Sequence, residues 1–216
     1  MIRISEIFFK EAIVEFRQKY ALGGIFLFAG ALVFLVYKVF NQLSDLEWSV
    51  MLWIITLFAG INAIVKSFVQ EKKETYLYYY ALLEPLELLF AKLLYNTFFL
   101  LVLFGAVLVF MSLFFGFPVK EPVLFAGSSF LGLFGMSVIL TFVSLIANTE
   151  QSNSTLMSVL SIPLLIPIVL LLLKTTTVSL RIISDTSVDK DIWMLAGIVS
   201  VMLGTVIILF PVLWRS

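Results

Sequence analysis

Residues 93–115 read LLYNTFFLLVLFGAVLVFMSLFF, a predominantly apolar run that contains no charged side chain. A helix needs about 20 apolar residues to cross the hydrocarbon core of a bilayer, because each residue advances it by about 1.5 Å. The run therefore predicts a membrane-spanning helix. The rest of the chain has the same character, since 62% of its 216 residues are hydrophobic and 13% are charged. This composition, with a mean hydropathy of +1.11, indicates an integral membrane protein.

Five further apolar runs are bounded by charged residues and predict five more spans. The six predicted spans lie near 21–40, 48–69, 93–115, 123–147, 154–173 and 192–214. A polar loop over 174–191 separates the last two, and Asp185, Asp189 and Asp191 are interpreted as solvated residues of that loop. The sequence thus predicts a single all-α membrane domain over residues 1–216, with no room for a large soluble domain.

Lys and Arg residues are distributed unevenly around the predicted spans. Nine of the 14 lie on the side that carries both termini, and five lie on the opposite side. Because cytoplasmic loops of membrane proteins carry an excess of Lys and Arg, both termini are expected in the cytoplasm. The nine are Arg3, Lys10, Arg17, Lys19, Lys66, Lys72, Lys73, Lys92 and Arg215.

Several classes of chemistry are excluded by residues that the chain lacks. It has no cysteine and no histidine, which removes disulfides, thiolate nucleophiles, Ser-His-Asp triads and the usual haem ligands. No G-x-x-x-x-G-K-[ST] phosphate-binding loop occurs, so any ATP hydrolysis must be carried out by a partner. The net charge of zero gives no attraction to nucleic acid. We expect no catalytic, cofactor-binding or metal-binding residues, and a membrane-embedded enzyme is the disfavoured alternative.

The first twenty residues are charged at short intervals and are also amphipathic. Phe9, Ile13, Phe16 and Tyr20 repeat at helical spacing, so residues 2–20 are predicted to form a helix that lies in the lipid headgroup plane. The alternative is a surface anchor that only fixes the first span.

The segment 70–92 is a long, tyrosine-rich loop on the predicted cytoplasmic side. We expect a short helix at about 71–83, then a break, because Pro85 suits the first turn of a new helix that enters the membrane near Lys92. Tyrosines beside charged residues are typical of protein interfaces, although tyrosine also collects at bilayer surfaces. The predicted docking residues of this segment are Glu71, Lys72, Leu77, Tyr78, Tyr79, Tyr80, Glu84 and Pro85.

Two patterns inside the spans concern helix geometry. Pro163 and Pro167 are four residues apart on one face of the fifth span, where each removes a backbone hydrogen bond. They are predicted to form a hinge, with a static bend as the alternative.

In the fourth span, Ser128, Gly132 and Gly135 form a stripe of small residues that predicts close helix packing. No carboxylate occupies the middle of a predicted span, which disfavours an ion-coupled carrier.

Several of these stretches together resemble a known family. They are KE at 10–11 with FRQKY at 16–20, KSFVQE at 66–71, LYYY at 77–80 followed by Pro85 and the AK pair at 91–92, and above all LSIPLLIP at 160–167. On these residues the chain resembles the CcmB family, the permease-like haem exporter protein B of cytochrome c maturation. The resemblance covers essentially the whole chain, although KETY at 73–76 departs from the glycine-containing pattern seen in divergent members.

The resemblance implies a fold, partners and a location. It implies an ABC-2-type export permease of six transmembrane helices in the bacterial inner membrane, with the 70–92 loop as a coupling helix and residues 2–20 as an interfacial elbow. It also implies assembly with an ABC ATP-binding subunit, a haem-handling membrane subunit and a small accessory membrane protein. ATP hydrolysis would then drive haem export or release of a haem-loaded chaperone.

The cofactor and the transported substrate are less closely determined. Without His or Cys, this chain could ligate haem iron only through Met or Tyr, so we expect partner subunits to handle haem. The alternative function is a permease of the same architecture that exports a lipid, a polysaccharide or a drug, because a fold does not fix its substrate.

Overall fold

The computed structural model describes residues 19–69, 85–149, 154–183 and 188–215. All regular structure in these ranges is helical, and each of the six helices there is long and apolar enough to cross a membrane. The prediction of an all-α protein with six spans is confirmed. The helices are α2 (Lys19–Phe40), α3 (Asp45–Val69), α5 (Pro85–Phe115), α6 (Pro122–Thr149), α7 (Ser154–Ser179) and α8 (Val188–Arg215).

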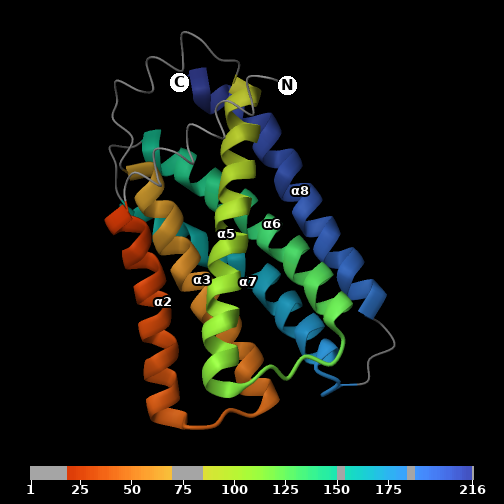
Figure 1. Ribbon diagram of the computed structural model, residues 1–216. Coiled ribbons are helices and arrows are strands. Elements are labelled where there is room, and N and C mark those ends of the chain that lie inside the picture. Colours follow the sequence, from red (N-terminus) through yellow and green to blue (C-terminus); the bar gives the residue numbers. More distant parts are fainter. Residues whose placement is uncertain (1–18, 70–84, 150–153, 184–187, 216) are drawn as a thin grey trace.

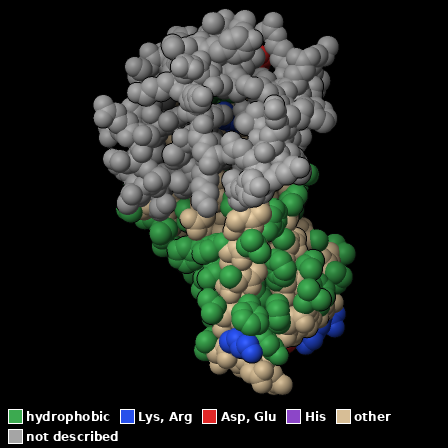
Figure 2. Space-filling view, turned by 60° about the vertical axis from the view of Figure 1, so that its left-hand side comes forward, with side chains coloured by type: hydrophobic (Ala, Val, Ile, Leu, Met, Phe, Trp, Pro, Cys, Tyr) green, Lys and Arg blue, Asp and Glu red, His purple; other side chains and the backbone are tan. Residues whose placement is uncertain are grey.

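Successive helices run in opposite directions, so the bundle has two ends (Figure 1). The end that holds the start of α5 and the end of α8 is called the terminal end. The opposite end, which holds the connections 41–44 and 116–121, is called the distal end. Figure 2 shows hydrophobic side chains over the described lateral surface and basic side chains gathered at the distal end. This distribution suits a bundle surrounded by lipid.

Helix α6 lies at the centre of the packing. It contacts α3, α5, α7 and α8, whereas α2 packs against α3 and α5. Leu133, Met136 and Leu140 of α6 are completely buried and join one hydrophobic core with residues of the other helices. Helix α6 therefore shares an interface with four of the other helices, while Val123 and Phe130 leave part of its surface exposed.

Local sequence determines where α3 begins. The backbone N–H of Ser44 donates to Oε2 of Glu47 over 2.8 Å, and the backbone N–H of Glu47 donates to the Ser44 hydroxyl over 3.3 Å. This reciprocal pair is a capping box, which satisfies backbone donors that have no partner within the helix. It starts α3 at Asp45, three residues before the predicted span.

The predicted polar loop over 174–191 is wrong at both ends. Helix α7 continues to Ser179 and α8 already begins at Val188. The hydroxyls of Thr175, Thr177 and Ser179 each donate to a backbone carbonyl three residues earlier, at 3.1, 2.7 and 2.7 Å. Because these hydroxyls are satisfied within the helix, the polar run can remain helical and buried.

Candidate functional site

The predicted docking segment lies almost entirely outside the described residues, as do residues 2–18 of the predicted amphipathic helix. Pro85 is described, and it is the first residue of α5. The prediction that Pro85 opens a new helix is confirmed. The docking residues outside the described part are Glu71, Lys72, Leu77, Tyr78, Tyr79, Tyr80 and Glu84.

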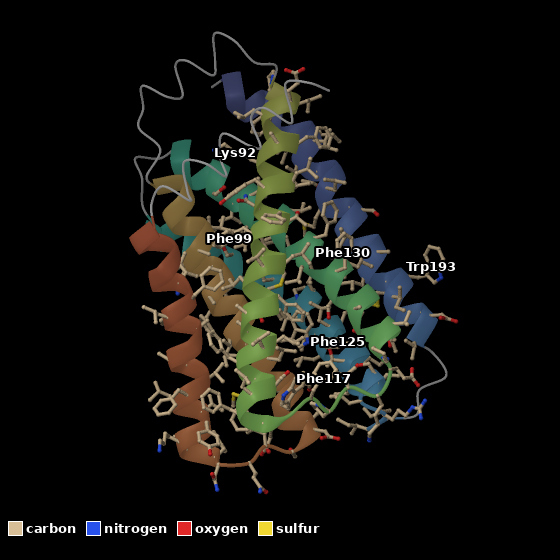
Figure 3. The ribbon with its side chains drawn as sticks, in the orientation of Figure 1. Lys92, Phe99, Phe117, Phe125, Phe130 and Trp193 are labelled. Carbon is tan, nitrogen blue, oxygen red and sulfur yellow. The ribbon has the colours of Figure 1, made fainter. Side chains whose placement is uncertain are left out.

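Helix α5 carries buried polar side chains directly after the docking segment. Lys92 is 5% exposed and Asn96, one turn further, is 2% exposed. Lys92 lies toward the terminal end of the helix (Figure 3). The sequence places Lys92 where the helix enters the membrane, but its side chain lies inside the protein. Polar groups buried in a membrane bundle are costly, so they commonly mark functional positions.

Two polar side chains of α5, those of Asn96 and Thr97, are bonded to α6. The amide nitrogen Nδ2 of Asn96 donates to the hydroxyl of Thr141 over 2.8 Å. The hydroxyl of Thr97 lies 3.0 Å from that of Ser137 and 2.8 Å from the carbonyl of Leu93. We call Asn96, Thr97, Ser137 and Thr141 the α5–α6 polar ladder. It locks the two helices together over their terminal halves.

Sequence reasoning missed the ladder, although a signal was present. Asn96 and Thr97 interrupt one apolar span, and Ser137 and Thr141 stand four residues apart in another. Residues four apart share one face of a helix. Two spans that each carry polar residues on one face are candidates for pairing.

A second polar cluster ties the distal end of α7 to its neighbours. The indole Nε1 of Trp53 in α3 donates to the hydroxyl of Thr176 in α7 over 2.9 Å, and both residues are fully buried. The ring of Trp53 also stacks on that of Phe104 in α5, with centroids 5.3 Å apart. Backbone N–H groups of Lys120 and Glu121 donate to the carbonyl of Ser179, at 3.1 and 2.9 Å.

Two ion pairs complete the distal cluster. The ammonium of Lys174 in α7 lies 2.8 Å from Oδ2 and 3.1 Å from Oδ1 of Asp191 in α8. Asp191 is only 7% exposed, so its interpretation as a solvated loop residue is wrong. At the surface, Nε of Arg181 lies 3.1 Å from Oε1 of Glu121. We define the distal hub as Trp53, Glu121, Lys174, Thr176, Ser179, Arg181 and Asp191.

The end of α7 is closed by a cap that positions Arg181. The N–H of Ile182 donates to the carbonyl of Thr177 over 3.1 Å, and that of Arg181 donates to the carbonyl of Val178 over 2.8 Å. With Arg181 at a φ of 56°, these two bonds form a Schellman cap. Residues other than glycine rarely adopt such a φ. Arg181 therefore makes its ion pair with Glu121 from an uncommon backbone conformation.

Pro163 and Pro167 both lie inside α7, on its exposed side. Leu165 and Ile168, on the opposite side, are fully buried. The two prolines therefore weaken the backbone hydrogen bonding of α7 without being packed into the protein core. Their predicted role as a hinge remains a prediction.

Of the three small residues of α6, the two glycines face the last two helices. A Cβ added at Gly132 would meet the side chain of Leu172 in α7, and one at Gly135 would lie 2.6 Å from Val199 in α8. Ser128 is 2% exposed, and its hydroxyl donates to the carbonyl of Leu124 over 2.8 Å. Helices α7 and α8 thus approach α6 where it has no bulky side chains.

The described residues contain no group of three or more acidic side chains that could hold a metal ion. The buried polar groups of the ladder and the hub bond mainly to one another, across helices. Such an arrangement is suited to holding helices in register and to passing movement between the two ends. Six long apolar helices, joined by polar contacts, define an all-helical, multi-pass membrane protein, an architecture that is consistent with a six-span permease.

The chain belongs to the CcmB family, because the family model described as CcmB protein matches residues 2–212. No curated protein and no solved structure matches the chain. Membership makes it a membrane component of the ABC transporter of cytochrome c maturation, a haem-export system with an ATP-binding partner subunit. The family and the six apolar helices together support a multi-pass protein of the inner membrane.

Proposed function

We propose that this chain couples ATP hydrolysis by a cytoplasmic partner subunit to haem export, or to release of a haem-loaded chaperone on the outer face. In this proposal the terminal end faces the cytoplasm and residues 71–85 dock onto the ATPase. The chain itself carries no catalytic residue. A haem-handling membrane subunit and a small accessory membrane protein of the same system handle the haem.

One observation carries the proposal. Helix α5 begins at Pro85, directly after the docking segment, and runs over 31 residues to Phe115 at the distal end. At about 1.5 Å per residue its length is roughly 46 Å, more than the hydrocarbon core of a bilayer. The α5–α6 polar ladder joins its terminal half to the central helix. A displacement applied at Pro85 is therefore passed to α6 and not absorbed by a loose contact.

The test is whether the ATPase co-purifies with variants of the docking segment. Leu77→Asp and Tyr79→Asp should each lose the ATPase, because an unpaired charge at the centre of an interface opposes association. Gln42→Asp adds the same charge to the exposed connection at the distal end and is the matched control. Retention of the ATPase at wild-type yield by both docking variants, with the chain still in the membrane, would overturn the proposal.

A second measurement addresses the transported substrate. The Leu77 and Tyr79 variants should also lose mature c-type cytochromes, whereas the Gln42 variant should keep them. If the docking variants lost the ATPase but matured cytochrome c normally, the chain would act in a different export process.

A further inference from the structure

The distal end of α7 is fixed to α3, to α8 and to the connection that precedes α6. Thr176 accepts a hydrogen bond from Trp53 of α3, and Lys174 pairs with Asp191 of α8. The carbonyl of Ser179 accepts two backbone hydrogen bonds from the residues that lead into α6. Because these partners lie on two other helices and on the connection before α6, the distal end of α7 cannot shift without breaking several contacts together.

The contact between Trp53 and Thr176 is the most buried member of the distal hub. Both side chains are fully buried, and the hydrogen bond joins residues 123 positions apart in the sequence. Loss of the hydroxyl would leave the indole N–H without its acceptor in an apolar interior, which is unfavourable. The stacked ring of Phe104 further restrains the indole from α5.

The terminal half of α7 is held differently. Pro163 and Pro167 have no N–H group, so the backbone bonds to the carbonyls four residues earlier are missing. Around them, Val159, Leu160 and Ile166 are 63%, 40% and 48% exposed. This half is therefore packed on one side only, and its backbone hydrogen bonding is weakened. It is the half that lies nearer the terminal end.

We propose that Trp53 and Thr176 are positioning residues, which fix the distal end of α7 while its terminal half moves about Pro163 and Pro167. This inference rests on the proposed function, in which movement of the ATPase enters at the terminal end. Helix α3 ends at Val69, just before the docking segment, and it also carries Trp53. The same helix therefore adjoins the docking segment at one end and holds α7 at the other.

The chain offers a matched set of variants to test the inference. Thr176→Val removes the acceptor of the Trp53 indole at nearly constant volume, and Thr176→Ser keeps it. Thr175→Val is the control, because the buried Thr175 hydroxyl donates only to the carbonyl of Leu172 in its own helix, over 3.1 Å. The quantities to measure are the yield of the complex, its ATPase rate and the amount of cytochrome c matured per ATP hydrolysed.

The three variants should separate positioning from stability. We expect Thr176→Val to assemble and to hydrolyse ATP, while cytochrome c matured per ATP falls at least several-fold. Thr176→Ser and Thr175→Val should keep the wild-type ratio. A wild-type ratio in Thr176→Val, or an equal loss in Thr175→Val, would overturn the positioning role.

A measurement that leaves the hub intact covers the case in which Thr176→Val does not assemble. Spin labels at Val159 and at Ile182 are each paired with a label at Leu46, at the distal start of α3, the helix that holds α7 through Trp53; all three positions are exposed. Labelled chains are diluted with unlabelled chains, so that only distances within one chain contribute. Between the nucleotide-free and the ATP-trapped complex, the distance from Val159 should change and that from Ile182 should not.

The spin-label experiment also distinguishes the two proposals. An equal change in both distances, or no change in either, would contradict a fixed distal end with a moving terminal half. Co-purification of the ATPase, measured on the same samples, decides separately whether the docking segment binds it.

Discussion

The side-chain amide of Asn96 donates a hydrogen bond to the hydroxyl of Thr141 over 2.8 Å, between two helices of a membrane bundle and with both residues buried. Lipid offers these groups no alternative partner, so the pair specifies how α5 packs on α6. The bond lies between the docking segment and the centre of the bundle. Its loss should therefore lower both the stability of the bundle and the coupling of ATP hydrolysis to transport.

Thr141→Val should lower the free energy of unfolding by about 1–2 kcal/mol, because the Asn96 amide loses its acceptor. The measurement is the midpoint of denaturation in increasing fractions of sodium dodecyl sulfate. Adding Asn96→Leu to Thr141→Val should recover part of the loss, since no polar group then remains unpaired. Fully additive losses in the double variant would show that the two side chains do not interact.

Gly132→Ala should lower the free energy of unfolding by about 1–3 kcal/mol, because the new methyl group would collide with Leu172. Gly127→Ala in the same helix is the control, since a Cβ there meets nothing within 4 Å. The two variants can be compared by the same denaturation assay. Equal stability of the two would mean that α7 can move away from α6 without cost.

The two ion pairs of the distal hub should differ in their contributions. Lys174→Met leaves the buried carboxylate of Asp191 without its cation, and should cost roughly 1–3 kcal/mol after allowance for the 44% exposure of the lysine side chain. Arg181→Met breaks an exposed pair and should cost less than about 1 kcal/mol. High salt should weaken only the Arg181 pair appreciably. A larger loss in Arg181→Met than in Lys174→Met would contradict the burial seen at Asp191.

The orientation of the chain can be tested with introduced cysteines, because the sequence contains none. A cysteine at Thr75 should react with a reagent supplied from the cytoplasm. Cysteines at Glu121 and at Thr186 should react with an impermeant reagent supplied from outside. Labelling of Thr75 from outside would reverse the topology and remove the docking segment from the reach of a cytoplasmic ATPase.

Replacing both Pro163 and Pro167 with Ala should restore the missing backbone hydrogen bonds of α7 and stiffen the helix. Both prolines are exposed, so the change creates no void in the core. We expect a complex that assembles and hydrolyses ATP but matures little cytochrome c. Normal cytochrome c levels would make the prolines a static bend, and loss of the complex would make them structural.

The number of spans and the start of α5 could be predicted from the sequence, for reasons that are local. Bilayer thickness fixes how many apolar residues a span needs, and proline at 85 favours the first turn of a helix. Family membership was also carried by local stretches such as LSIPLLIP at 160–167. The end of α7 was predicted too early because its last turns are polar. The hydroxyls of Thr175, Thr177 and Ser179 donate to backbone carbonyls of the same helix, which lets this polar stretch stay helical.

The sequence by itself determined that this protein is a six-helix membrane bundle, because the length and spacing of its apolar runs set the spans. Only the tertiary structure decided which polar residues meet, as Asn96 meets Thr141 and Trp53 meets Thr176. Hydrophobic periodicity distinguishes core from water, but a span that is apolar on all sides gives no such contrast between protein and lipid. Partners 45 and 123 residues apart are therefore selected by packing, because each buried polar group must find a donor or acceptor on a neighbouring helix.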